Sequence, residues 1–121
     1  MKAIMYHYVR EFREDLPNFR YLDFKSFKNQ LNFFGEKYGF VKKDEWLNFV
    51  EKGELPKIKG KIILTFDDGL RDHYDFVFNE LKSRGLWGIF YINSFPYRKR
   101  EILDVHKVHL LCSLYDGKDL L

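Results

Sequence analysis

Two kinds of hydrophobic pattern alternate along this chain. Short continuous apolar runs rich in β-branched and aromatic residues predict three buried strands, at 2–9, 61–66 and 86–92. Segments whose apolar residues recur every three or four positions predict four helices, at 24–38, 44–52, 72–84 and 102–114. Asp23 is a good N-cap for the first of these helices, and Gly39 a natural stop.

The stretch from 61 to 92 predicts a strand, a helix and a second strand within about 30 residues, which is the size of a parallel crossover unit. Parallel strands are normally covered by helices on their faces. We therefore expect an α/β fold with parallel strands and flanking helices. The 121 residues are enough for one domain, 1–121, around one core.

The composition changes this picture in one respect, because thirteen Phe, eight Tyr and two Trp make 19% of the chain aromatic. That is more than a small core needs, so some rings are expected to line a cleft or an interface.

A net charge of +3 is too weak for nucleic-acid binding. The single Cys112 forms no internal disulfide and is expected in the core. No leader or membrane-spanning run is visible, which favours a cytoplasmic protein that binds no membrane.

The candidate chemistry lies where the second strand ends, at Asp67-Asp68-Gly69. Catalytic groups of α/β folds collect at the carboxyl ends of strands. Two adjacent carboxylates repel each other unless they share a proton or a cation, and a divalent metal would resolve this conflict. One carboxylate would then bind the ion while the other acts as a general base for water. Alternatively, the pair caps the next helix and Gly69 is an ordinary turn residue.

The motif Thr65-Phe66-Asp67-Asp68-Gly69, followed by a helix and an aromatic strand, resembles the first motif of the polysaccharide deacetylases of the NodB type. The opening segment Met5-Tyr6-His7-Tyr8-Val9 is similar to the first strand of that family. The resemblance covers residues 1–94 and implies a distorted (β/α) barrel that removes acetyl groups from an N- or O-acetylated carbohydrate. It also implies that Asp67 is the catalytic base and that Asp68 binds a divalent metal, zinc above all, in the complete enzyme.

The sequence departs from the family at the remaining metal ligands, which should be two histidines in a His-(Ser/Thr)-x-x-His pattern. The nearest candidates are His106 and His109, which are three residues apart and could both coordinate one ion. We favour the alternative that they lie at the margin of an apolar helix face. His7 is expected near the motif, where it either contacts a carboxylate or substrate or packs as an ordinary strand residue. His73 is expected to face solvent.

The length predicts an incomplete barrel, because eight strand–helix units take about 250 residues and 121 accommodate about four. We expect an N-terminal part of a deacetylase that stops before the histidine motif, through a truncated frame, a split gene or a fragment. Its open sheet would favour self-association or a complementing C-terminal segment. A second hypothesis is therefore a catalytically inactive half-barrel or binding module that needs a partner segment.

Overall fold

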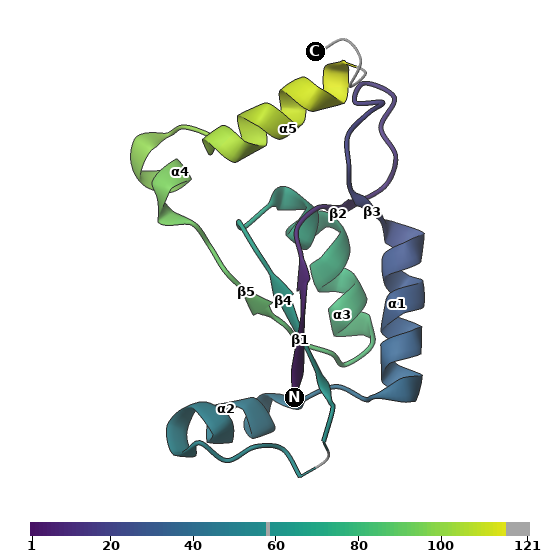
Figure 1. The fold of residues 1–121 in the computed structure, drawn as a ribbon, viewed down its shortest axis with the longest axis vertical. Coiled ribbons are helices and arrows are strands. Elements are labelled where there is room, and N and C mark those ends of the chain that lie inside the picture. Colours follow the sequence, from purple (N-terminus) through teal and green to yellow (C-terminus); the bar gives the residue numbers. More distant parts are fainter. Residues whose placement is uncertain (58, 116–121) are drawn as a thin grey trace.

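The computed structural model describes residues 1–57 and 59–115 and contains a three-stranded parallel sheet (Figure 1). The strands are β1 (Lys2–Tyr6), β4 (Ile62–Phe66) and β5 (Ile89–Phe90), in the order β1-β4-β5. Five consecutive residue pairs join β1 to β4, from Lys2 opposite Ile62 to Tyr6 opposite Phe66. The predicted α/β architecture with parallel strands is confirmed, and β4 is the central strand.

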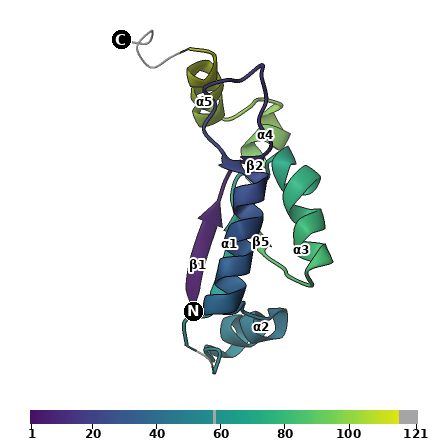
Figure 2. The same cartoon turned by 90° about the vertical axis from the view of Figure 1, so that its right-hand side faces the viewer.

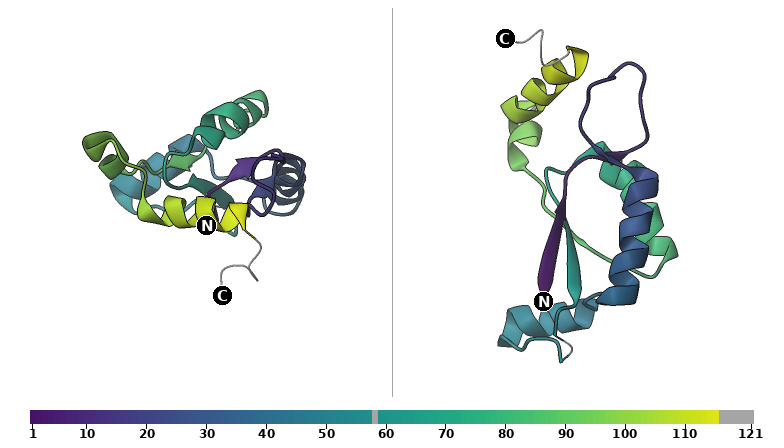
Figure 3. Two further views of the ribbon diagram at one scale, coloured as in Figure 1. Left: turned by 90° about the horizontal axis from the view of Figure 1, so that it is seen from above. Right: turned by 45° about the vertical axis from the view of Figure 1, so that its right-hand side comes forward.

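The helices occupy three positions around this sheet. Beside it lie α1 (Phe24–Lys37) and the helix that follows β4, which begins as the π-helix η1 (His73–Phe78) and continues as α3 (Asn79–Ser83) (Figures 1 and 2). At the amino ends of the strands lies α2 (Lys43–Lys52). Beyond the carboxyl ends lie α4 (Ser94–Lys99) and α5 (Asp104–Leu114), and α5 crosses above the sheet when the molecule is seen from above (Figure 3).

The first helix forms where its sequence predicts it. The Asp23 carboxylate accepts hydrogen bonds from the amides of Lys25 and Ser26, at 2.9 and 3.1 Å, and so satisfies two donors of the first turn. Gly39 adopts a φ of 70° just after the helix, a conformation that glycine reaches without steric cost. The helix therefore has a defined beginning and end.

The core lies between the sheet and these helices and is strongly aromatic. Tyr6 of β1 stacks on Phe66 of β4 at 5.4 Å and meets Phe27 of α1 edge-on at 5.1 Å. All three side chains are buried, and each such burial stabilises the fold by about 1.5–3 kcal/mol. Leu31 of α1 and Val77 of η1 belong to the same cluster. This packing holds the end of β4 in a fixed position.

Three local predictions are wrong. The first strand ends at Tyr6, and the chain bends before a separate two-stranded parallel sheet of β2 (Val9–Arg10) and β3 (Leu22–Asp23). The bend forms because Leu22 donates its amide to the Tyr8 carbonyl at 2.9 Å, which draws the chain out of the main sheet. A short helix, α4, follows β5 at a place where the sequence pattern predicts none.

The third difference concerns α5, which begins at Asp104 and leaves much of its apolar surface uncovered. Cys112 is exposed rather than part of the core, because no other described element packs over that side of the helix. No helix among the described residues is both long and apolar enough to cross a membrane.

Candidate functional site

Asp67 and Asp68 leave the central strand at its carboxyl end, as predicted. The Asp67 amide donates to the Tyr6 carbonyl at 2.9 Å, which extends the pairing of β1 and β4 by one bond. Asp68 then adopts a φ of 74°, in the left-handed region that side chains other than glycine rarely enter. Such a conformation costs about 1–3 kcal/mol and is frequent at functional sites. It turns the chain sharply, so that both carboxylates remain at the edge of the sheet.

Gly69 takes part in the same turn with a φ of 61°. A Cβ atom at this position would lie 3.4 Å from the side chain of Ile92, which follows β5. Any larger residue would therefore be both strained and crowded. The turn after β4 is a defined structure rather than a loose connection.

His7 lies beside the two carboxylates because β1 and β4 are neighbours. Its Nε2 atom is 4.0 Å from Asp67 Oδ2 and 3.8 Å from Asp68 Oδ2. Both distances are too long for a direct hydrogen bond. The imidazole is 43% exposed, so it remains open to a ligand. The structure thus places His7 next to the motif, while its role in substrate binding stays a prediction.

His106 reaches the site from α5, which is 38 residues further along the chain. Its Nε2 atom donates to Asp68 Oδ2 at 3.1 Å, and its side chain is largely buried. Its packing differs from the favoured interpretation, in which both histidines lay at the margin of an apolar face. Asp68 is therefore held by a hydrogen bond, whereas no hydrogen bond to the Asp67 side chain is found among the described residues.

His109 lies one turn further along α5 and contacts Tyr8 instead of the carboxylates. Its Nδ1 atom shares a hydrogen bond of 3.1 Å with the Tyr8 hydroxyl. The pKa of Tyr8 is raised, first by burial and then by the negative charge of Asp68. The two histidine rings are 6.4 Å apart between centroids. Of these two histidines, only His106 therefore contacts the Asp67-Asp68 pair.

The donors found here do not by themselves fit the zinc that the resemblance implies. A catalytic zinc site normally has three protein ligands around one ion. Within residues 1–57 and 59–115, no group of three His, Cys, Asp or Glu side chains could hold a metal. His106 and Asp68 satisfy each other directly, and His109 is engaged by Tyr8. The assignment of Asp68, His106 and His109 as metal ligands stays a prediction.

His73 lies behind the site, and the expectation that it faces solvent is wrong. It is only 4% exposed because the first turn after the motif packs against the core aromatics. Its Nε2 atom lies 2.7 Å from the backbone carbonyl of His7 and must carry a proton, since a carbonyl only accepts. Its Nδ1 atom is buried with no partner in the part of the chain that the structure describes. Burial lowers the pKa of the ring, which favours the neutral form.

A buried ion pair links the strand after His7 to the helix that carries His73. Arg10 of β2 donates to both Asp72 oxygens through Nε and Nη2, at 2.7 and 2.8 Å. The two side chains are 16% and 10% exposed. The Arg10 guanidinium also lies over the Phe19 ring at 4.7 Å. The hydrogen bond of His73 and this ion pair together fix the His7–Tyr8 bend relative to the motif.

Sequence reasoning did not find this supporting network. Arg10 reads only as the charged end of a strand, and Asp72 as a residue of the first helical turn. The two are 62 residues apart, and nothing in their local patterns indicates a contact. Tyr8 belongs to the Tyr-His-Tyr segment that resembles the family's first strand, but the sequence indicated no contact or function for it.

Comparison with solved structures identifies the fold. No protein-family model and no curated protein matches the sequence. A de-N-acetylase from Aggregatibacter actinomycetemcomitans is similar with a TM-score of 0.55 and 21% identity, over 73% of this chain and 35% of that one. The deacetylase PplD from Streptococcus pyogenes, in complex with acetate, is similar with a TM-score of 0.63 and 20% identity, over 92% of this chain and 51% of that one.

The chain therefore has a deacetylase-like α/β fold. It spans about a third and about half of the lengths of these two structures. The fold class expected from the sequence is confirmed, since the second likeness extends over nearly all of the chain. Both identities are low, so the likeness concerns the fold.

Proposed function

We propose that the protein acts as part of a hydrolase of the deacetylase type, which removes acetyl groups from an N- or O-acetylated carbohydrate. The observation that carries the proposal is the pair Asp67 and Asp68 at the carboxyl end of the central strand, with His7 and His106 beside it. The deacetylase-like fold supports the same reaction class. Assignment to the NodB family rests on the sequence motif and is part of the proposal.

The two carboxylates have unequal surroundings, which supports different roles. Asp68 is hydrogen-bonded to His106 and is thereby held in one orientation. Asp67 receives no such bond within the described chain, and its side chain is 27% exposed. A general base must be free to take a proton from water, so Asp67 fits that task better.

The proposed reaction is addition of water to the acetyl carbonyl. Asp67 accepts one proton of the attacking water as the new carbon–oxygen bond forms. The bond from the carbonyl carbon to the sugar nitrogen or oxygen then breaks, acetate leaves, and the proton passes to the sugar amine or hydroxyl. His7 is placed to bind the sugar or the developing charge beside the carboxylates.

Metal dependence is a separate part of the proposal. A bound divalent ion, zinc above all, would polarise the acetyl carbonyl and acidify the water. Asp68 would be one of its ligands, and donors beyond those brought together within the described residues would be required. A complementing polypeptide segment is one source of such donors.

A second candidate function is supported by the same lack of a three-donor cluster in the described chain. In this alternative the protein binds a carbohydrate or a partner segment without hydrolysing anything. Acetate release from N-acetylglucosamine oligomers, with zinc, cobalt or manganese added in turn, decides between the two. Metal-stimulated release supports the hydrolase, and binding of the oligomer without release supports the alternative.

A further inference from the structure

A cleft of about 360 Å³ opens where β1 ends and β3 begins. Its lining includes His7, Tyr8, Arg20 and Tyr21. His7 belongs both to this cleft and to the surroundings of Asp67 and Asp68. A saccharide whose acetylated unit lies at the carboxylates would therefore extend into the cleft with its neighbouring unit.

The cleft is held in shape by bonds that do not depend on a ligand. Leu22 donates its amide to the Tyr8 carbonyl at 2.9 Å, which fixes Tyr21 next to Tyr8. The Tyr8 ring packs edge-on against the buried Phe19 at 4.6 Å. The loop before Arg20 is tied to α5 by the bond from the Asn18 amide to the Ser113 carbonyl, at 3.1 Å. A site built in this way loses little entropy on binding.

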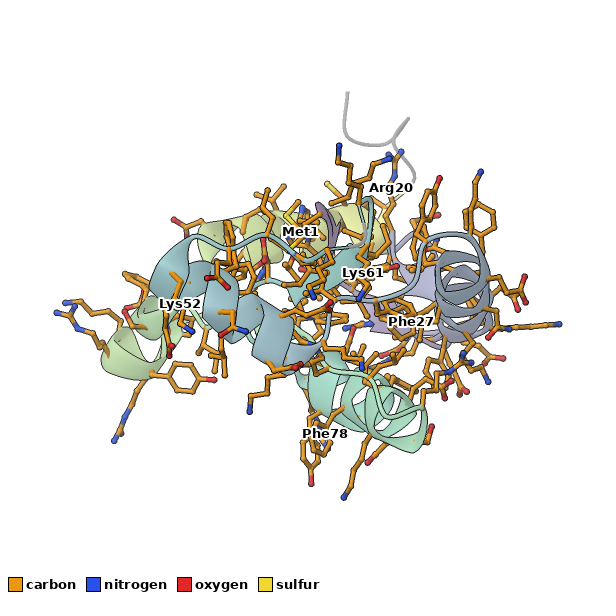
Figure 4. All side chains as sticks on the ribbon, turned by 90° about the horizontal axis from the view of Figure 1, so that it is seen from below. Met1, Arg20, Phe27, Lys52, Lys61 and Phe78 are labelled. Atoms are coloured by element: carbon orange, nitrogen blue, oxygen red, sulfur yellow. The ribbon has the colours of Figure 1, made fainter. Side chains whose placement is uncertain are left out.

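The chemistry of the lining is specific. Tyr21 offers a flat ring with a hydroxyl group, which suits a sugar ring that has both apolar and polar faces, whereas the Tyr8 hydroxyl is already bonded to His109. Arg20 is exposed and points away from the ribbon when the molecule is seen from below (Figure 4). It forms no ion pair with any described residue, whereas Arg13 of the same loop is paired with Asp15. A guanidinium without a charged partner in the described chain is matched to a carboxylate or a phosphate.

We propose that this cleft is a subsite for an anionic sugar unit next to the acetylated one. Tyr21 packs against the sugar ring, and Arg20 pairs with its carboxylate or phosphate group. The inference deepens the proposed function, on which it rests for the substrate class. It assigns to the loop before β3 the selection of charged over neutral acetylated glycans.

Binding rather than turnover tests this inference, by calorimetric titration of the whole chain with matched saccharides. Hyaluronan tetrasaccharide against N-acetylglucosamine tetramer probes a carboxylate. N-acetylglucosamine 1-phosphate, whose phosphate stands where a neighbouring unit would be attached, against N-acetylglucosamine probes a phosphate. We expect the anionic member of at least one pair to bind about tenfold more tightly. The pair that shows the difference identifies the anionic group.

Variants assign the effect to Arg20. Arg20→Gln should remove the preference, Arg20→Lys should keep part of it, and Arg13→Gln should leave it unchanged. Tyr21→Ala should weaken the charged and the neutral saccharides alike. Equal binding of charged and neutral members in both pairs, no binding of any saccharide, or a preference that survives in Arg20→Gln would overturn the inference.

The same titrations separate this inference from the proposed function. Asp75→Asn, which changes an exposed carboxylate outside the site, should bind the anionic saccharide as the wild type does. Anionic preference in a protein that releases no acetate would leave the subsite standing and contradict the hydrolase. Acetate release with no Arg20-dependent preference would support the hydrolase and contradict the subsite.

Discussion

His106 donates a hydrogen bond of 3.1 Å to Asp68, and this contact joins α5 to the turn after the central strand. The neighbouring His109 shares a hydrogen bond with the Tyr8 hydroxyl, on the segment that follows β1. One helix thus contacts both strand ends of the candidate site through its two histidines. Within the described chain, Asp67 receives no such side-chain hydrogen bond.

The uncovered side of α5 leads to a prediction about association. The exposed apolar side chains, each about half accessible, are Val105, Val108, Leu111 and Leu114. Exposed apolar side chains in this number along one helix are typical of an interaction surface. We expect the isolated chain to self-associate in size-exclusion chromatography with light scattering, and Leu111→Lys to reduce the association. A monomer that melts cooperatively at all concentrations would contradict this prediction.

Zinc should bind the chain weakly. Asp68 and His106 are the only two predicted ligands that the described structure brings into contact, and three protein ligands are normally needed. Calorimetric titration at neutral pH measures the affinity. Tight binding of one zinc per chain that is lost in both His106→Ala and His109→Ala would show that these residues are ligands after all.

The Arg10–Asp72 ion pair should contribute strongly to stability. Asp72→Asn leaves a largely buried guanidinium without its charged partner, and the expected loss in the free energy of unfolding is about 3 kcal/mol. Asp75→Asn is the matched control, because its partner Arg71 is 89% exposed and such pairs contribute less than about 1 kcal/mol. Urea denaturation of the two variants measures the difference. Equal effects would show that burial of the pair is unimportant.

His73 should make stability depend on pH. Burial lowers the pKa of its ring in the folded state, so the unfolded chain binds the proton more readily. The free energy of unfolding should therefore fall as the pH drops below about 6.5, the ordinary histidine value. Replacement by Gln removes this titration, so the urea midpoint of His73→Gln should change less between pH 7.5 and pH 5.5. An equal change in both proteins would contradict the assignment.

The parts of this structure that could be predicted from sequence are those set by neighbouring residues. The first helix follows from the Asp23 cap and a regular apolar spacing, and the position of Asp67 and Asp68 follows from the end of an apolar run. The burial of His73 depends on a carbonyl 66 residues away. The contact of His106 with Asp68 likewise depends on where α5 packs, which no local pattern specifies.

The exposure of Cys112 shows the same limit from the other side. An apolar segment predicts burial only when some other element covers it, and within the described chain α5 remains largely uncovered there. The bend at His7 and Tyr8 is also a tertiary effect, since the backbone bond from Leu22 to Tyr8 creates it. Long-range contacts therefore decide the details of the candidate site, while local patterns decide its place in the fold.

The two carboxylates should separate by role once a complementing segment supplies the further metal donors. Asp68→Asn is expected to weaken metal affinity first, because it changes the proposed ligand and its bond to His106. Asp67→Asn is expected to keep the metal, because no described side chain depends on Asp67 for a hydrogen bond. Metal content measured on both purified variants checks this prediction, and loss of metal from Asp67→Asn alone would mean that the roles are exchanged.

The most direct test of the account is the rate of acetate release by Asp67→Asn, compared with the wild type at equal metal content and with a complementing segment present. An N-acetylglucosamine oligomer is the substrate, and Asp75→Asn serves as a control that removes an exposed carboxylate outside the site. Loss of a general base typically slows a reaction by about 10²- to 10⁴-fold, and we predict a loss of this size for Asp67→Asn alone. Acetate release by Asp67→Asn at the wild-type rate would contradict the account and leave the pair as a structural turn.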